Sequence, residues 1–143
     1  MCKKKHRGGN AEQYHADRKY KEAVAVAVEA CAADTAGQTC FICMDGPAEE
    51  GLVRMCACRG ASGFAHVSCL AKDAQVAVER ADTGWARWHT CRQCEQQYHG
   101  VVRCALGWAC WKTYLGRPEV DGLRMNAMTV LGLGLFSATH HED

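Results

Sequence analysis

The sequence predicts a small α+β module set between an N-terminal and a C-terminal helical segment, and three observations lead to this fold class. The chain has 143 residues, about the length of one domain. Seven of its eleven cysteines lie within residues 40–94 at short, regular spacings. The segments on both sides lack such spacings, and their composition and periodicity favour helices.

Residues 1–36 are expected to form a basic tail and a helix. Ala, Glu, Lys and Gln dominate residues 11–33, and no Pro or Gly occurs there. An alternation of Ala and Val within this stretch is a weak strand signal, but its length and flanks favour a helix. The basic residues 3–7 are interpreted as a solvated terminus, with phosphate binding or targeting as the alternatives.

Residues 37–99 are the predicted module. One short helix is expected within it, over residues 70–81, and it should end near Gly84. Its apolar face should consist of four residues at helical spacing: Ala71, Ala74, Val78 and Ala81.

Residues 100–143 predict a helical hairpin. The first helix should cover residues 101–115 and the second residues 119–139, with Gly116 and Pro118 between them. Glycines inside the second segment disfavour a helix there. The hairpin should bury large side chains from both helices against each other: Trp108, Trp111, Leu131 and Leu135.

Four Cys/His pairs follow one another along the module. They are Cys40/Cys43, Cys56/Cys58, His66/Cys69 and Cys91/Cys94. A pair with two intervening residues places two donors on one cation, and structural Zn²⁺ takes four such donors in a tetrahedron. The odd number of cysteines and the lack of an apolar signal-peptide run argue against disulfides. The four pairs together therefore predict two Zn²⁺ ions.

The spacing alone allows the four pairs to combine sequentially or alternately. We expect the alternate, cross-braced arrangement. It gives the first zinc Cys40, Cys43, His66 and Cys69, and the second zinc Cys56, Cys58, Cys91 and Cys94. Eight donors fill two tetrahedra, so neither ion keeps an open position for a substrate, and both should be structural rather than catalytic.

Charge and hydropathy exclude several other functions. The net charge is +1, which argues against a nucleic-acid partner for the chain as a whole. The most apolar stretch, residues 101–115, is interrupted by Arg103 and Lys112, so no membrane span is expected. Cysteines that bind metal must stay reduced, which implies a reducing compartment. We therefore expect an intracellular, cytoplasmic protein.

Four stretches carry a family resemblance. They read CFIC at 40–43, CACRG at 56–60, HVSCL at 66–70 and CRQC at 91–94, followed by Tyr98. Together they resemble the RING-CH (RING-variant) zinc finger of ubiquitin ligases, with a single residue inside the second pair and His at the fifth ligand position. The PHD finger shares the order of ligand types, but its usual spacings differ from these.

The resemblance implies a ubiquitin–protein ligase without a covalent intermediate. Such a finger recruits a ubiquitin-charged conjugating enzyme and promotes ubiquitin transfer to a protein substrate by positioning the reactants. Ile42 matches the apolar residue that usually contacts the conjugating enzyme. The Trp that many members carry four residues after the sixth ligand is replaced by Asp73. This departure shifts the expected contact toward other residues, such as Leu52, Val53 or Trp88.

Two further alternatives remain open from the sequence. Asp73 leaves a non-catalytic protein-interaction adaptor as the competing function. Near the C-terminus, Leu131, Gly132 and Leu135 faintly resemble the first helix of a tetratricopeptide repeat, although a plain helical extension packed on the finger is favoured.

Overall fold

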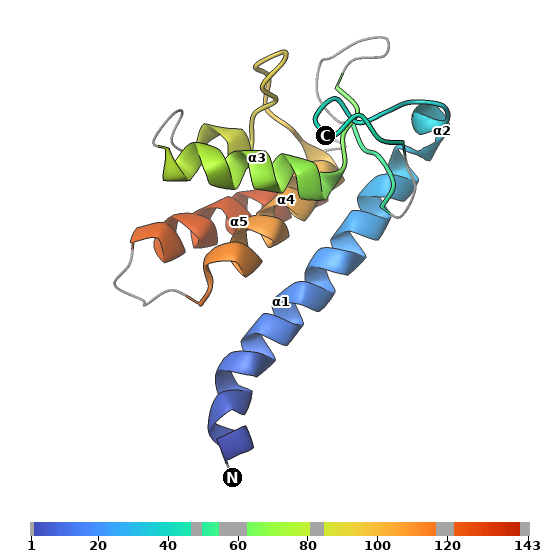
Figure 1. Ribbon diagram of the computed structural model, residues 1–143. Helices are drawn as coiled ribbons and strands as arrows, with labels where there is room; N and C mark the ends of the chain where they lie inside the picture. Colours follow the sequence, from blue (N-terminus) through green and yellow to red (C-terminus); the bar gives the residue numbers. More distant parts are fainter. Residues whose placement is uncertain (1, 47–49, 55–62, 81–84, 117–121, 141–143) are drawn as a thin grey trace.

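The computed structural model describes residues 2–46, 50–54, 63–80, 85–116 and 122–140 (Figure 1). Their elements are the helices α1 (Cys2–Ala30), α2 (Ala32–Thr35), α3 (Val67–Glu79), α4 (Gly100–Tyr114) and α5 (Gly122–His140), and a 3-10 turn, η1 (Ala86–Trp88). Figure 1 shows α3, α4 and α5 stacked beside one another, with the long α1 inclined to them and meeting the loop of residues 40–46 near its C-terminal end.

The expected α+β class is not confirmed. Within the described ranges the backbone is mostly helical, and β pairing is limited to two isolated antiparallel bridges, Val53 with Ala65 and Thr90 with Gln97. These bridges nevertheless fix the loops that carry the Cys and His residues.

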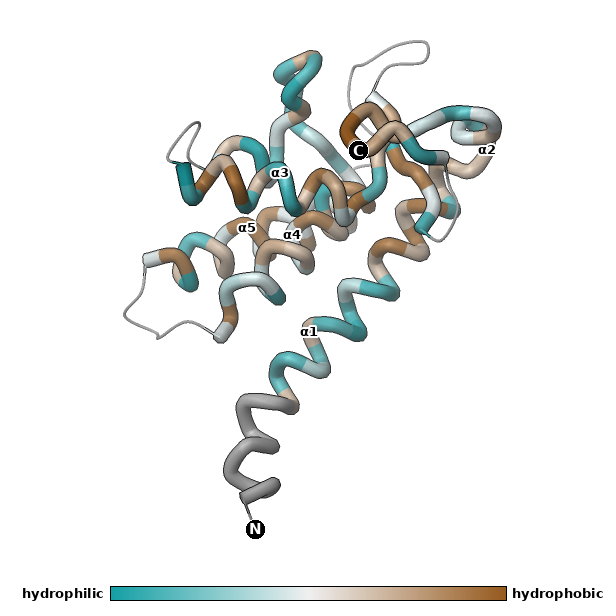
Figure 2. The backbone as a smooth tube through the Cα atoms, in the orientation of Figure 1, coloured by the Kyte–Doolittle hydropathy of each residue, from teal (hydrophilic) through white to brown (hydrophobic). Residues whose placement is uncertain are grey.

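Helix α1 is longer than the predicted residues 11–33 and begins at Cys2. Figure 2 shows that its apolar residues gather in the half that ends at Ala30, where the helix meets the module. Gly51 allows this approach, because a Cβ atom at this position would overlap the side chain of Val28. The Ala/Val alternation therefore serves helix packing, and the weak strand signal was misleading.

A second group of contacts joins α1 to α4. The His15 ring meets Trp108 edge-on at a centroid separation of 6.0 Å. The Lys112 ammonium lies 3.6 Å from the Asp17 carboxylate and 4.8 Å from the centre of the Tyr20 ring. Trp108 thus contacts α1, a neighbour that the predicted hairpin did not include.

Helices α4 and α5 pack closely through two glycines. A Cβ atom on Gly107 would lie 3.1 Å from the Leu131 Cα atom, and one on Gly134 would lie 2.7 Å from the Arg103 carbonyl oxygen. The Ser137 hydroxyl, in the last turns of α5, accepts a 2.7 Å hydrogen bond from the Gly100 N–H at the start of α4. Within α5, Gly134 therefore acts as a packing site, and neither it nor Gly132 ends the helix.

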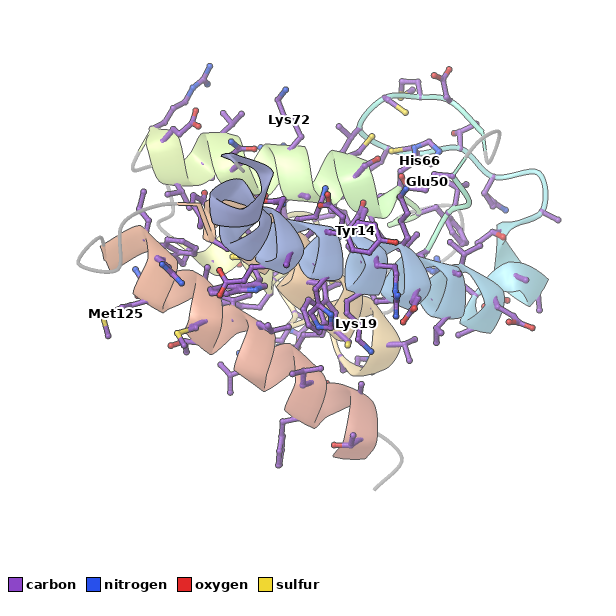
Figure 3. The ribbon with its side chains drawn as sticks, turned by 90° about the horizontal axis from the view of Figure 1, so that it is seen from below. Tyr14, Lys19, Glu50, His66, Lys72 and Met125 are labelled. Atoms are coloured by element: carbon purple, nitrogen blue, oxygen red, sulfur yellow. The ribbon has the colours of Figure 1, made fainter. Side chains whose placement is uncertain are left out.

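The predicted hairpin is correct in its elements but wrong about Leu135. This side chain is 42 % exposed, together with other large apolar residues of α5: Met125, Met128, Leu133 and Phe136. Figure 3 shows Met125 pointing away from the neighbouring helices. The core side of α5 is formed instead by Ala127 and Gly134, which let the backbone of α4 come close.

One buried cluster connects all parts of the described structure. It includes Ala27 of α1, Leu52 and Phe64 of the loops, Leu70 of α3 and Leu106 of α4. Trp88 of η1 is fully buried and meets the Tyr114 ring edge-on at 6.2 Å. Val67, Leu70 and Ala74 of α3 are buried in this cluster. Ala71 and Val78 pack against it while remaining partly exposed, so these members of the predicted face are confirmed, and Ala81 lies outside the described residues.

Candidate metal centre

The first half of the site is a tight turn, which we name the first knuckle, residues 40–45. The Met44 N–H donates to the Cys40 carbonyl oxygen at 2.9 Å, and the Cys40 N–H donates to the Asp45 carbonyl oxygen at 2.8 Å. Two further N–H groups, of Ile42 and Cys43, lie 3.4 and 3.5 Å from the Cys40 sulfur. Such donors stabilise a thiolate, which is the form of cysteine that binds metal.

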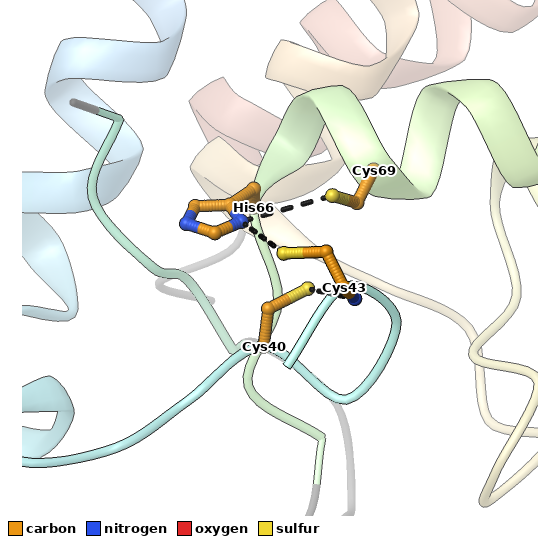
Figure 4. Close-up of side chains that lie close together, drawn as sticks. All are labelled: Cys40, Cys43, His66 and Cys69. Atoms are coloured by element: carbon orange, nitrogen blue, oxygen red, sulfur yellow. Dashed lines mark hydrogen bonds between the residues drawn. The ribbon is translucent and has the colours of Figure 1, made fainter. Parts of the chain in front are cut away.

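The second half is provided by the start of α3. His66 is the N-cap residue of this helix and has an extended backbone, with φ −77° and ψ 141°. Cys69 follows in the first turn, so both side chains project toward the first knuckle (Figure 4). The Val53–Ala65 bridge and a 2.9 Å hydrogen bond from the Phe41 N–H to the Phe64 carbonyl oxygen hold the two halves together.

The four side chains converge as expected. The donor atoms of Cys40, Cys43, His66 and Cys69 all lie within 4.8 Å of one another. The His66 Nδ1 atom is 3.4 Å from the Cys43 sulfur and 3.7 Å from the Cys69 sulfur. A tetrahedron with Zn–S and Zn–N bonds of ordinary length has N···S edges of about 3.5 Å. The donor set and its spacing therefore fit Zn²⁺.

A contact behind the ring decides which nitrogen of His66 faces the cluster. The opposite nitrogen, Nε2, lies 3.0 Å from the Gly46 carbonyl oxygen, to which it can donate a hydrogen bond. Donation from Nε2 leaves Nδ1 with its lone pair directed at the sulfurs. Metal-binding histidines are commonly oriented in this way by a carbonyl or carboxylate outside the ligand set.

The thiols differ in acidity. Burial raises the pKa of Cys40, but hydrogen bonds from the N–H groups of Cys43, His66 and Ile42 outweigh this effect and lower its pKa to about 7. Burial, together with the nearby charge of Cys40, raises the pKa of Cys69 to about 12. Several thiolates packed this closely repel one another, and a divalent cation would remove that repulsion.

The Cys91/Cys94 pair forms a second knuckle, residues 91–96, with the same backbone pattern as the first. The Glu95 N–H donates to the Cys91 carbonyl oxygen at 2.8 Å, and the Cys91 N–H donates to the Gln96 carbonyl oxygen at 2.9 Å. The residue after the second cysteine has positive φ in both knuckles, 70° for Met44 and 62° for Glu95. This shared geometry is consistent with zinc binding by both pairs.

The remaining predicted residues have varied positions. Cys56 and Cys58 lie outside the described residues. Ile42 is partly exposed on the first knuckle, whereas Leu52 and Trp88, which the sequence offered as contacts for the conjugating enzyme, are fully buried in the core. Two further histidines, His89 and His99, flank the Cys91/Cys94 pair in the sequence, and among the described residues neither belongs to a group that could hold a metal ion.

Sequence reasoning did not identify two contacts that organise the site. The first is the Gly46 carbonyl oxygen behind His66, for which a backbone atom gives no residue-type signal. The second is the Glu50 carboxylate, which accepts a 3.0 Å hydrogen bond from the Ser68 N–H at the start of α3. Glu50 lies 18 positions before Ser68 in the sequence. Only tertiary folding brings the two together, so no local capping pattern indicates this contact.

These features define a class of protein: a small Cys/His-rich finger that uses metal to hold its loops. Residues 40–96 match the family of the RING-variant domain, and this part of the chain is a RING-variant domain. No curated protein and no solved structure matches the chain. Among the described residues, no helix combines the length and apolar character needed to cross a membrane.

Proposed function

We propose that this chain is a RING-CH-type ubiquitin–protein ligase. Its finger would bind two structural Zn²⁺ ions in the alternate arrangement, the second held by Cys56, Cys58, Cys91 and Cys94. It would recruit a ubiquitin-charged conjugating enzyme and promote transfer to a protein substrate, in the cytoplasm. The observation that carries the proposal is the RING-variant match over residues 40–96, together with the four converging donors of the first site.

The finger contributes positioning rather than covalent chemistry. Every donor of the first site belongs to a closed set of four, which favours a structural role for the metal. In a ligase of this kind the reactive thioester belongs to the conjugating enzyme. A rigid docking surface can accelerate transfer by restricting the orientations of the thioester and the acceptor amine.

The proposed docking surface includes Ile42, which is partly exposed and lies between the two cysteines of the first knuckle. Leu52 and Trp88 belong to the same proposed contact region but are fully buried. Their contribution would be indirect, since they fill the core that supports the knuckle. We therefore expect direct contact to depend on Ile42.

The test is a ubiquitin-transfer assay with zinc-loaded protein and a panel of conjugating enzymes, comparing the wild type with Ile42→Ala. We expect transfer with at least one enzyme and a loss of about tenfold or more on substitution, as for an apolar residue central to an interface. Val26→Ala is the matched control, because Val26 is an exposed aliphatic residue of α1. Absence of transfer with every enzyme would contradict the ligase proposal.

The second candidate function is a protein-interaction adaptor that transfers nothing. Asp73 favours it, because an ion-paired carboxylate occupies the position where many RING-CH fingers have a Trp. The same assay separates the two functions. An adaptor would bind protein partners in a zinc-loaded state without promoting ubiquitin transfer.

A further inference from the structure

Asp73 and Arg92 form an ion pair between α3 and the second knuckle. The Arg92 Nη1 atom lies 2.8 Å from the Asp73 Oδ1 atom. The two side chains are covered to different degrees: that of Asp73 is 23 % exposed and that of Arg92 is 50 % exposed. The carboxylate is therefore mostly enclosed, whereas half of the guanidinium side chain faces solvent.

The Asp73 end of the ion pair lies close to the first metal site, whose knuckle carries Ile42. Asp73 lies one helical turn beyond Cys69, whose sulfur is within 4.8 Å of the Cys43 sulfur. Ile42 directly precedes Cys43, and Arg92 directly follows Cys91. The neighbouring cation on α3, Lys72, projects away from the other helices in Figure 3. Arg92 is thus the cation that α3 and the second knuckle hold in a fixed direction.

Stability alone gives little reason for this arrangement. An ion pair with one half-exposed partner contributes little to the free energy of unfolding, because water and salt screen it. The ion pair has a clearer role in binding a partner protein, because it leaves donors of Arg92 available. A guanidinium has five N–H donors, and only the Nη1 group is used by Asp73, so the others can meet a second acceptor. A carboxylate matches this planar set of donors best.

We propose that Arg92, held in place by Asp73, selects the conjugating enzyme by pairing with an acidic side chain beside the apolar contact at Ile42. This inference rests on the proposed ligase function and adds the chemistry of the partner. An enzyme with an apolar residue at this position would leave the ion pair covered and its remaining donors unmatched, which weakens binding.

The experiment compares two exchanges of an ion pair that both preserve the net charge. Asp73→Arg with Arg92→Asp reverses the pair on the proposed surface. Arg18→Glu with Glu22→Arg reverses a pair on α1, whose closest atoms are 3.6 Å apart. Dissociation constants are measured for zinc-loaded full chain with a panel of conjugating enzymes, at low and high salt.

We expect the exchange at positions 73 and 92 to weaken the best-binding enzyme about tenfold or more, and the exchange on α1 to change nothing. High salt should weaken the wild-type complex but have less effect on Arg92→Met. An acid-to-Lys substitution in the docking loop of that enzyme should restore its affinity for the exchanged pair. Zinc content and melting temperature identify any variant that fails to fold.

Two other outcomes overturn the proposal in distinguishable ways. If both exchanges leave the order of the enzyme panel unchanged while Ile42→Ala weakens transfer, the ligase function stands and selection by Arg92 is wrong. If the zinc-loaded wild type binds no conjugating enzyme, the ligase function itself is wrong, and selection by Arg92 fails with it.

Discussion

Met44 and Glu95 occupy equivalent positions in the two knuckles, each directly after a second cysteine and each with positive φ. Their N–H groups both donate to the carbonyl oxygen of the first cysteine of the knuckle. This left-handed conformation lets the chain close the turn that carries the two cysteines. It is unfavourable for residues with a Cβ atom, by about 1–2 kcal/mol relative to the right-handed region.

Replacement of either residue by glycine should therefore stabilise the zinc-loaded protein. We expect Met44→Gly and Glu95→Gly each to raise the free energy of unfolding by about 0.5–1 kcal/mol, since glycine removes the strain but adds chain entropy to the unfolded state. Thermal unfolding of zinc-loaded samples measures the effect. Asp45→Gly is the control, because Asp45 lacks positive φ and should lose stability.

His66 and His99 provide a matched pair for testing the first zinc. Each is the N-cap residue of a helix, has an extended backbone and makes no side-chain capping hydrogen bond. Only His66 lies in the donor cluster. We expect His66→Ala to lose the first ion and unfold the module, because a structural site supplies on the order of 10 kcal/mol.

Metal analysis and near-ultraviolet circular dichroism test this expectation. His99→Ala and His89→Ala should retain two zinc ions per chain and the wild-type spectrum. A wild type that binds only one zinc would contradict the two-site arrangement. A His66→Ala protein with full zinc content would contradict the assignment of His66.

Two glycines of α5, Gly132 and Gly134, should respond in opposite ways to substitution by alanine. Gly134→Ala should destabilise the protein by about 1–3 kcal/mol, because its Cβ atom would lie 2.7 Å from the Arg103 carbonyl oxygen on α4. Gly132→Ala meets nothing within 4 Å and should stabilise α5 by up to about 1 kcal/mol. Denaturant unfolding measures both changes. Equal effects of the two substitutions would disprove the glycine contact between α4 and α5.

The Cys110 thiol predicts a loss of stability in alkali. Burial raises its pKa above the ordinary value of 9.0. From about pH 9 upward, the unfolded chain releases this proton while the folded chain retains it, so the free energy of unfolding falls as pH rises. One such group contributes a slope of up to about 1.4 kcal/mol per pH unit.

Unfolding of the zinc-loaded protein between pH 7 and pH 10 measures this slope. Other buried thiols contribute to it, so Cys110→Ala should make the slope shallower rather than abolish it. An unchanged slope in the variant would show that the Cys110 thiol ionises equally in both states.

The metal centre was the most predictable part of the molecule. The alternation of Cys/His pairs is local chemistry, so Cys40, Cys43, His66 and Cys69 could be assigned as metal donors from the sequence, and their donor atoms do converge. The helices were predictable for a similar reason, since α3, α4 and α5 follow from composition and periodicity. In each case the signal lies within one stretch of sequence.

Properties that depend on the neighbour of an element were not predictable. The sequence cannot show that Trp108 meets His15 on α1, that Leu135 is exposed, or that Leu52 is enclosed. Likewise, Asp73 stands out in the sequence only as a missing Trp. Its partner Arg92, nineteen residues away, becomes visible only when α3 and the second knuckle are placed together.

The buried cluster that runs from Ala27 through the finger to Leu106 has a consequence for the life of the protein in a cell. Since the helices share their apolar interior with the metal-bearing loops, a chain deprived of zinc would expose that interior along most of its length. Chaperones and proteases recognise such exposure, so a modest loss of stability lowers steady-state abundance several-fold. We therefore expect the amount of this protein to follow the zinc supply.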